Sequence, residues 1–80
     1  MLHIEFRFWG NPLEAMLDRL PNAQVVRQDN QGAVIKATVF GRGIKMWLLS
    51  QAEFVEVLGP PDFRQEMVKT VAKMLQVYGT

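Results

Sequence analysis

The sequence predicts an α+β domain in which segments with the period of a strand alternate with segments with the period of a helix. Residues 2–9 alternate apolar and polar side chains, as a strand with one buried face does. Residues 62–78 repeat their apolar side chains at helical spacing. Between them, two strand-like runs flank a turn cluster at residues 29–32. Together these patterns predict a sheet covered by helices.

The first strand is expected to end at Gly10, and a helix is expected to begin directly after it. Asn11 can cap this helix, Pro12 suits its first position, and Glu14 can complete a capping box. Pro21 then ends it. The apolar positions of this helix are Leu13, Met16, Leu17 and Leu20.

An antiparallel hairpin is expected next, with strands at residues 23–28 and 33–40. Its four-residue turn ends at Gly32, which can adopt a positive φ. Residues 44–51 are then interpreted as a short helix. A short apolar run is also compatible with a strand, but Lys, Met, Leu and Gln favour a helix. Ile44, Trp47 and Leu48 lie on one side of this helix.

Residues 53–58 predict a fourth strand with Val55 and Val57 on one face, ended by glycine and two prolines. Asp62 is expected to cap the final helix. The apolar stripe of that helix comprises Phe63, Met67, Val71, Met74, Leu75 and Tyr78. The order β-α-β-β-α-β predicts a ferredoxin-like sandwich with a four-stranded antiparallel sheet and an additional C-terminal helix. Residues 1–80 are therefore expected to form a single domain.

One face of this sheet should be covered by helices, and the other should be open. The covered face is expected to hold Leu2, Ile4, Phe6, Phe8, Val26, Ile35, Ala37, Val39, Val55 and Val57. The open face is expected to hold His3, Glu5, Arg7, Trp9, Val25, Arg27, Lys36, Thr38 and Glu56. Its mixed charges indicate either cross-strand pairs on a solvated surface or a platform that binds a polar ligand or partner. A register slip of one residue would exchange the two sets.

Composition excludes several classes of function. The chain has no cysteine, which excludes disulfides, thiol nucleophiles and Cys-type zinc sites. His3 is the only histidine, and the carboxylates are scattered, so we expect no enzyme, no metal and no cofactor. The net charge of +1 lacks the basic excess of proteins that grip duplex nucleic acid. No apolar run approaches the roughly 18 residues that a membrane span requires.

Three further patterns have an ordinary structural explanation. The segment Gly41-Arg42-Gly43 with Lys45 resembles part of a phosphate-binding loop but lacks its spacing, so a turn is preferred. Base stacking in the manner of RNA-recognition domains is disfavoured, because Phe6 and Phe8 should point inward. The methionines at helical positions are expected to fill the core.

Two tryptophans in so small a domain suggest surface that is buried only against a partner.

The second half of the chain carries a more specific pattern. A short helix containing Trp47-Leu48-Leu49 leads into the strand at residues 54–60, Phe-Val-Glu-Val-Leu-Gly-Pro. Phe63-Arg64 then opens a long helix that ends at Tyr78. In the first half, the first strand is followed by a helix that carries Arg19 in its second half. This pattern resembles the WCX domain, the C-terminal extension of WYL-domain transcription regulators.

The resemblance implies a bacterial, cytoplasmic regulator. Such regulators join an N-terminal helix-turn-helix that binds DNA to a WYL domain that senses a nucleic-acid or other effector. The extension supports dimerisation and couples effector sensing to DNA binding. The resemblance also implies that these residues are the C-terminal part of a longer chain.

We therefore expect a non-enzymatic regulatory module that forms a homodimer. The candidate contacts to an anionic effector or a partner domain are Arg7, Arg27, Lys36 and Arg64. The candidates for interface packing are Trp9, Trp47 and Tyr78, although core packing would explain Trp47 and Tyr78 equally well. The alternative is a stand-alone ferredoxin-like module that dimerises through its sheet and senses a small ligand or a nucleic acid.

Overall fold

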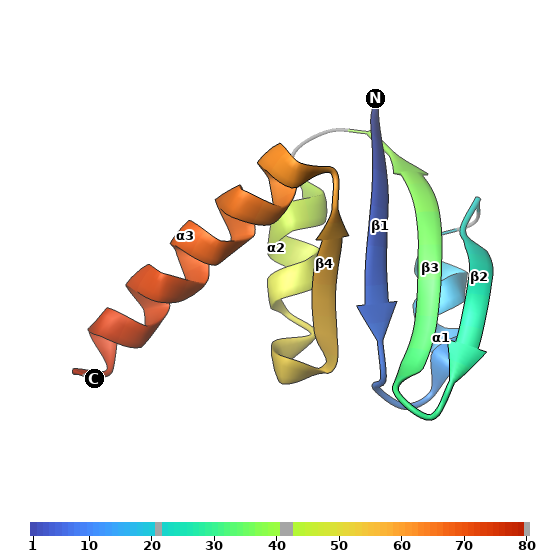
Figure 1. Cartoon of the computed structure of the whole chain (residues 1–80), viewed down its shortest axis with the longest axis horizontal. Coiled ribbons are helices and arrows are strands. Elements are labelled where there is room, and N and C mark those ends of the chain that lie inside the picture. Colours follow the sequence, from blue (N-terminus) through green and yellow to red (C-terminus); the bar gives the residue numbers. More distant parts are fainter. Residues whose placement is uncertain (21, 41–42, 80) are drawn as a thin grey trace.

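The computed structural model describes residues 1–20, 22–40 and 43–79. Its elements are β1 (Leu2–Phe8), α1 (Leu13–Arg19), β2 (Gln24–Asp29), β3 (Gly32–Val39), α2 (Gly43–Leu49), a 3-10 turn (Ala52–Phe54), β4 (Val55–Gly59) and α3 (Pro61–Val77). The strands form one antiparallel sheet in the order β2-β3-β1-β4 (Figure 1). This arrangement confirms the predicted ferredoxin-like α+β fold with its C-terminal helix.

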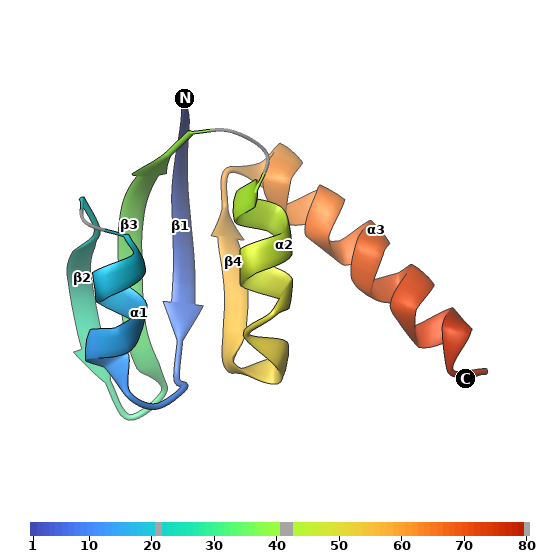
Figure 2. The ribbon, with the colours of Figure 1, turned by 180° about the vertical axis from the view of Figure 1, so that it is seen from behind.

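Helices α1 and α2 lie on the same face of the sheet, as the view from behind shows (Figure 2). The opposite face carries no helix in the described ranges (Figure 1). Phe6, Ile35 and Leu48 are the largest fully buried side chains, and they come from β1, β3 and α2. The core between helices and sheet comprises Ile4, Phe6, Phe8, Met16, Leu20, Ala33, Ile35, Ala37, Val39, Ile44, Leu48, Val57, Phe63 and Met67. The predicted inward positions of β1 and β3 are confirmed.

Strand β2 departs from the prediction, because all six of its residues are exposed. Its register against β3 shifts between Val25 and Arg27, so Val26 is the extra residue of a β-bulge. Val26 was predicted to be buried but is 55% exposed. Val25 was predicted for the open face, but it pairs with Ile35 and therefore lies on the covered side. A bulge breaks the period of two at a single residue, which the alternation of side chains cannot reveal.

Two predicted helix caps do not form. Helix α1 begins at Leu13 with Pro12 at the cap position and no side-chain cap, so Asn11 lies one residue too early. Helix α3 begins at Pro61 with Pro60 at its cap position, so Asp62 lies within the first turn. There its carboxylate interacts favourably with the helix dipole instead of capping.

The hairpin between β2 and β3 confirms the predicted turn, although the two strands extend further into it than expected. Asp29 and Gly32 pair, and only residues 30 and 31 lie between the strands. The Asp29 Oδ1 atom accepts a hydrogen bond of 2.8 Å from the main-chain N–H of Gln31. Gly32 has a φ of +115°, and a Cβ there would lie 2.6 Å from the carbonyl oxygen of Phe8. Only glycine therefore fits at this position.

The connection into β4 also differs from the prediction. Glu53 was expected to begin the fourth strand, but residues 52–54 form the 3-10 turn and β4 begins at Val55. Ala52 adopts a φ of +60°, which turns the chain from α2 toward β4. The predicted helix end at Pro21 and the predicted turn residues Gly41 and Arg42 lie outside the described residues.

Helix α3 is attached to the domain only through its first half. Phe63 and Met67 are buried in the core, and Glu66 lies 3.5 Å from the Nζ atom of Lys45 on α2. All residues from 71 to 79 are exposed. In both views, α3 leaves the sheet at the β4 edge and projects away from it (Figures 1 and 2). The predicted apolar stripe of this helix is therefore correct as a pattern, but only its first half enters the core.

Among the residues that the structure describes, no helix is long and apolar enough to cross a membrane.

Candidate functional site

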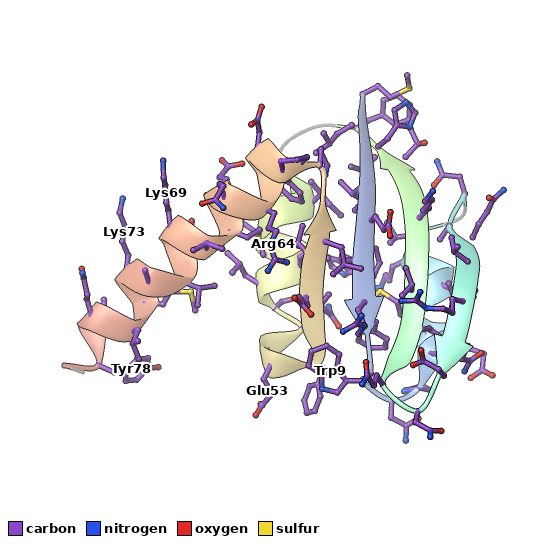
Figure 3. All side chains as sticks on the ribbon, in the orientation of Figure 1. Trp9, Glu53, Arg64, Lys69, Lys73 and Tyr78 are labelled. Carbon is purple, nitrogen blue, oxygen red and sulfur yellow. The ribbon has the colours of Figure 1, made fainter. Side chains whose placement is uncertain are left out.

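Three charged side chains form a row on the open face, one each from β1, β4 and α3. The Nη1 atom of Arg7 lies 3.5 Å from one carboxylate oxygen of Glu56. The Nη1 atom of Arg64 lies 3.2 Å from the other and donates a 2.6 Å hydrogen bond to the carbonyl oxygen of Val57. Arg64 thus reaches from α3 to β4 (Figure 3). Because one carboxylate faces two guanidinium groups, this cluster carries a net positive charge.

Val34 is buried on the same face, only 4% exposed, although it is not part of the main core cluster. It lies opposite Arg7 on β1 and opposite Arg27 on β2. The aliphatic stems of the flanking arginines can shield such a side chain while their charged ends stay in water. The alternation of apolar and polar residues does not distinguish Val34, because residues 33–35 are all apolar.

The four predicted basic contacts do not form one site. Arg7 and Arg64 are brought together by Glu56. Arg27 lies across Val34 from Arg7 and pairs with Asp29 at 3.7 Å on its own strand. Lys36 is exposed on β3, where it lies opposite Glu5 and Gln24. His3 is an exposed strand residue, as predicted, and its Nδ1 atom lies 2.9 Å from the hydroxyl of Thr38.

A shallow hollow of about 450 Å³ adjoins this charged cluster at the hairpin end of the sheet. It is lined by Arg7, Trp9, Asn30, Gln31 and Glu56. Trp9 is partly exposed there, and its main-chain N–H donates to the carbonyl of Phe54 at 3.0 Å. The hollow combines a guanidinium, an indole and two side-chain amides. The carboxylate of Glu56 also lines the hollow, so an anionic group would reach Arg7 only by competing with Glu56.

The predicted packing residues have different surroundings. Trp47 is partly buried and packs against the core from α2. Tyr78 is 83% exposed at the end of α3, so its alternative assignment to the core is wrong. Among the methionines, Met16 and Met67 fill the core as predicted, whereas Met46 and Met74 are exposed. Helical spacing shows which residues share a side, but it does not show whether another element covers that side.

The projecting half of α3 carries exposed apolar residues on one side, which we call the α3 stripe. Its members are Val68, Val71, Met74, Leu75 and Tyr78, which are 45–83% exposed. They continue the line of Phe63 and Met67 at helical spacing. Lys69 and Lys73 point away from Tyr78, on the far side of the helix (Figure 3). Monomeric proteins rarely expose contiguous apolar surface of more than a few hundred Å².

Among the described residues, no group of three or more His, Cys, Asp or Glu side chains is placed to hold a metal ion.

A ferredoxin-like sandwich that presents a charged sheet face and an exposed apolar helix is typical of a small interaction domain. The family model of the WCX domain matches residues 2–75, and the chain belongs to this family. The resemblance predicted from Trp47-Leu48-Leu49, the following strand and the terminal helix is thus confirmed. No curated protein and no solved structure matches the chain significantly. Membership of this family supports a role in WYL-type regulators.

Proposed function

We propose that the chain is a non-enzymatic regulatory and dimerisation module of a cytoplasmic WYL-type transcription regulator. The observation that carries this proposal is the WCX match, which extends from residue 2 to residue 75. In such a regulator, a helix-turn-helix domain reads DNA and a WYL domain senses the effector. The near-neutral charge of this chain is consistent with a regulator in which other domains contact the DNA phosphates.

In this proposal, the open face meets an anionic effector or an acidic surface of a neighbouring domain. Arg7 and Arg64 share Glu56, and arginine suits bidentate contacts to carboxylate or phosphate. An incoming anion would compete with Glu56 for both guanidinium groups. Because the same Arg64 also holds α3 to the carbonyl of Val57, binding at this cluster would alter the attachment of α3. This is the physical route by which effector binding could be coupled to dimer geometry.

The coupling can be tested in a regulator that carries this domain. Replacing Arg7 by Gln should reduce the change in operator affinity that the effector produces, because one of the two competing guanidinium groups is lost. Lys69→Gln is the matched control, since it removes the same charge from the far side of α3. An effector response that is unchanged by Arg7→Gln, or equally reduced by Lys69→Gln, would contradict the role of the open face.

Direct nucleic-acid binding is tested on the chain itself. Single-stranded DNA, labelled with a fluorophore, is titrated at low and at moderate salt, and anisotropy reports binding. Affinity that falls steeply with salt is expected if phosphates contact the arginines. The absence of binding at low salt would remove nucleic acid as a ligand of this chain and leave a small anion or a neighbouring domain as the partner of the open face.

The hollow beside Trp9 favours a second candidate function, the binding of a small planar anion by the domain alone. Benzoate is a simple probe of this site, because its ring can stack on an indole and its carboxylate can pair with Arg7. It should quench tryptophan fluorescence in the wild-type chain but not in Trp9→Phe, where only Trp47 remains. Quenching that persists in Trp9→Phe would argue against this candidate.

A further inference from the structure

Neither edge of the sheet is well suited to pairing with a second copy. Strand β2 forms one edge, and it carries the bulge at Val26 and the exposed charges of Arg27 and Asp29. Bulges and charged side chains on an edge disfavour the addition of a strand. Strand β4 forms the other edge. There the carbonyl oxygen of Val57 already accepts a hydrogen bond from the Arg64 side chain. A sheet edge is therefore a poor surface for a dimer of this chain.

We propose that the α3 stripe is that surface, and that its occupant is α3 of a second copy packed antiparallel, with the two stripes facing each other. The inference rests on the proposed function, because it names the surface through which the module dimerises. The stripe runs from Val68 to Tyr78, which corresponds to about 15 Å of helix. No charged side chain interrupts it, because Lys69 and Lys73 lie on the opposite side (Figure 3).

A second copy fits this surface because a two-fold axis places the same patch on both partners. Each stripe then meets an equally apolar stripe. Lys69 and Lys73 remain in water on the outer sides of the pair, so their like charges are not brought together. The chemistry of the stripe is thus complementary to itself.

The size of the stripe is consistent with a reversible dimer. Five side chains that are each about half exposed or more present on the order of 500 Å² of apolar surface per copy. Complete burial of both stripes would remove at most about 1,000 Å², which is near the lower limit for a specific interface. The two-fold axis would pass between Val71 and Met74, at the middle of the stripe. Tyr78 of one copy would then lie beside Val68 of the other, which accounts for an exposed aromatic residue at the tip of α3.

The absence of cysteine from the chain allows a direct test by disulfide formation. With Met74→Cys, mild oxidation should link most of the chain into a dimer, because this position lies next to its counterpart near the axis. Lys69→Cys is the matched control on the far side of the same helix and should remain unlinked. Equal linkage of the two variants, or no linkage of Met74→Cys under conditions where the chain is dimeric, would overturn the inference.

A second measurement separates this inference from the proposed function. Sedimentation equilibrium of Val71→Glu should show a dissociation constant raised at least tenfold, whereas Lys69→Glu should change it less than twofold. Circular dichroism should show both variants folded, because neither residue is buried in the core. A wild-type dimer that Val71→Glu leaves intact would overturn the α3 interface and leave dimerisation itself standing. A wild-type chain that stays monomeric at millimolar concentration would contradict both.

Discussion

The first residue of β3, Gly32, offers a stringent test of the fold. Its φ of +115° is a backbone conformation that residues with a side chain rarely adopt. A Cβ at this position would meet three atoms of the neighbouring segment, at 2.6 Å from the carbonyl oxygen of Phe8 and 3.1 Å from its carbonyl carbon and from the Cβ of Trp9. Two of these atoms belong to the main chain, so no rotation of a side chain relieves the clash. Gly32→Ala therefore must displace β1 or distort the turn.

The cost can be worked out from these contacts. A non-glycine residue in such a backbone conformation costs on the order of 1–3 kcal/mol. Forced displacement of packed neighbours adds about 1–3 kcal/mol. The reduced freedom of the unfolded chain offsets about 0.4–1 kcal/mol. The middle of these ranges gives a net loss of unfolding free energy of about 3 kcal/mol, which corresponds to a fall in Tm of roughly 12–24 °C for a domain of this size.

Thermal and urea denaturation, followed by circular dichroism, measure this loss. Gly43→Ala is the control, because a Cβ at the first residue of α2 meets no atom within 4 Å. Alanine there also favours the helix, so its unfolding free energy should rise by up to about 1 kcal/mol. If Gly32→Ala lay within about 0.5 kcal/mol of the wild type, the close approach of the hairpin to Phe8 would be refuted.

Three further substitutions test other parts of the structure. Ala52→Gly should raise the urea midpoint slightly, by roughly 0.5 kcal/mol of stability, because relief at a φ of +60° exceeds the entropy cost of glycine; a lower midpoint would contradict that strain. Phe63→Ala should lower the unfolding free energy by about 3 kcal/mol in urea titrations, because this buried ring anchors α3; a loss below 1 kcal/mol would place α3 elsewhere. Arg64→Leu should lower the unfolding free energy by about 1 kcal/mol, a small value because the side chain is 42% exposed and its ion pair is screened by solvent. The variant's Tm should also depend less on salt than the wild-type Tm does. An unchanged salt dependence would argue against the ion pair with Glu56.

The elements that the sequence predicted well are those with an uninterrupted apolar period. Strand β1 alternates without a break, and its inward residues Ile4, Phe6 and Phe8 are buried as expected. Strand β2 is the counterexample, since the bulge at Val26 depends on how the strand pairs with β3 rather than on its own sequence. The helix starts were misjudged for a related reason. Asn11 has the chemistry of a cap, but the backbone places Pro12 at that position.

The candidate site was predictable residue by residue but not as an arrangement. Arg7 and Arg64 were chosen for their chemistry, and the structure joins them through Glu56. This bridge depends on the direction in which α3 leaves β4, which no periodicity encodes. The exposure of Tyr78 depends on the same direction, because a helix that packed along the sheet would have buried it. The orientation of α3 therefore determines both the charged cluster on the open face and the exposed apolar surface of the helix.

The partial attachment of α3 gives the domain the geometry of a lever. Its pivot lies at the buried residues Phe63 and Met67, and the ion pairs of Arg64 and Lys45 sit beside that pivot. From Met67 to the end of the helix at Val77 the arm measures about 15 Å. A rotation of about 10° at the pivot would therefore move the tip by roughly 3 Å. A small change in side-chain packing beside the charged cluster would thus displace the C-terminal end of α3 by several ångströms. Such a displacement is large enough to separate or realign a partner bound at that end.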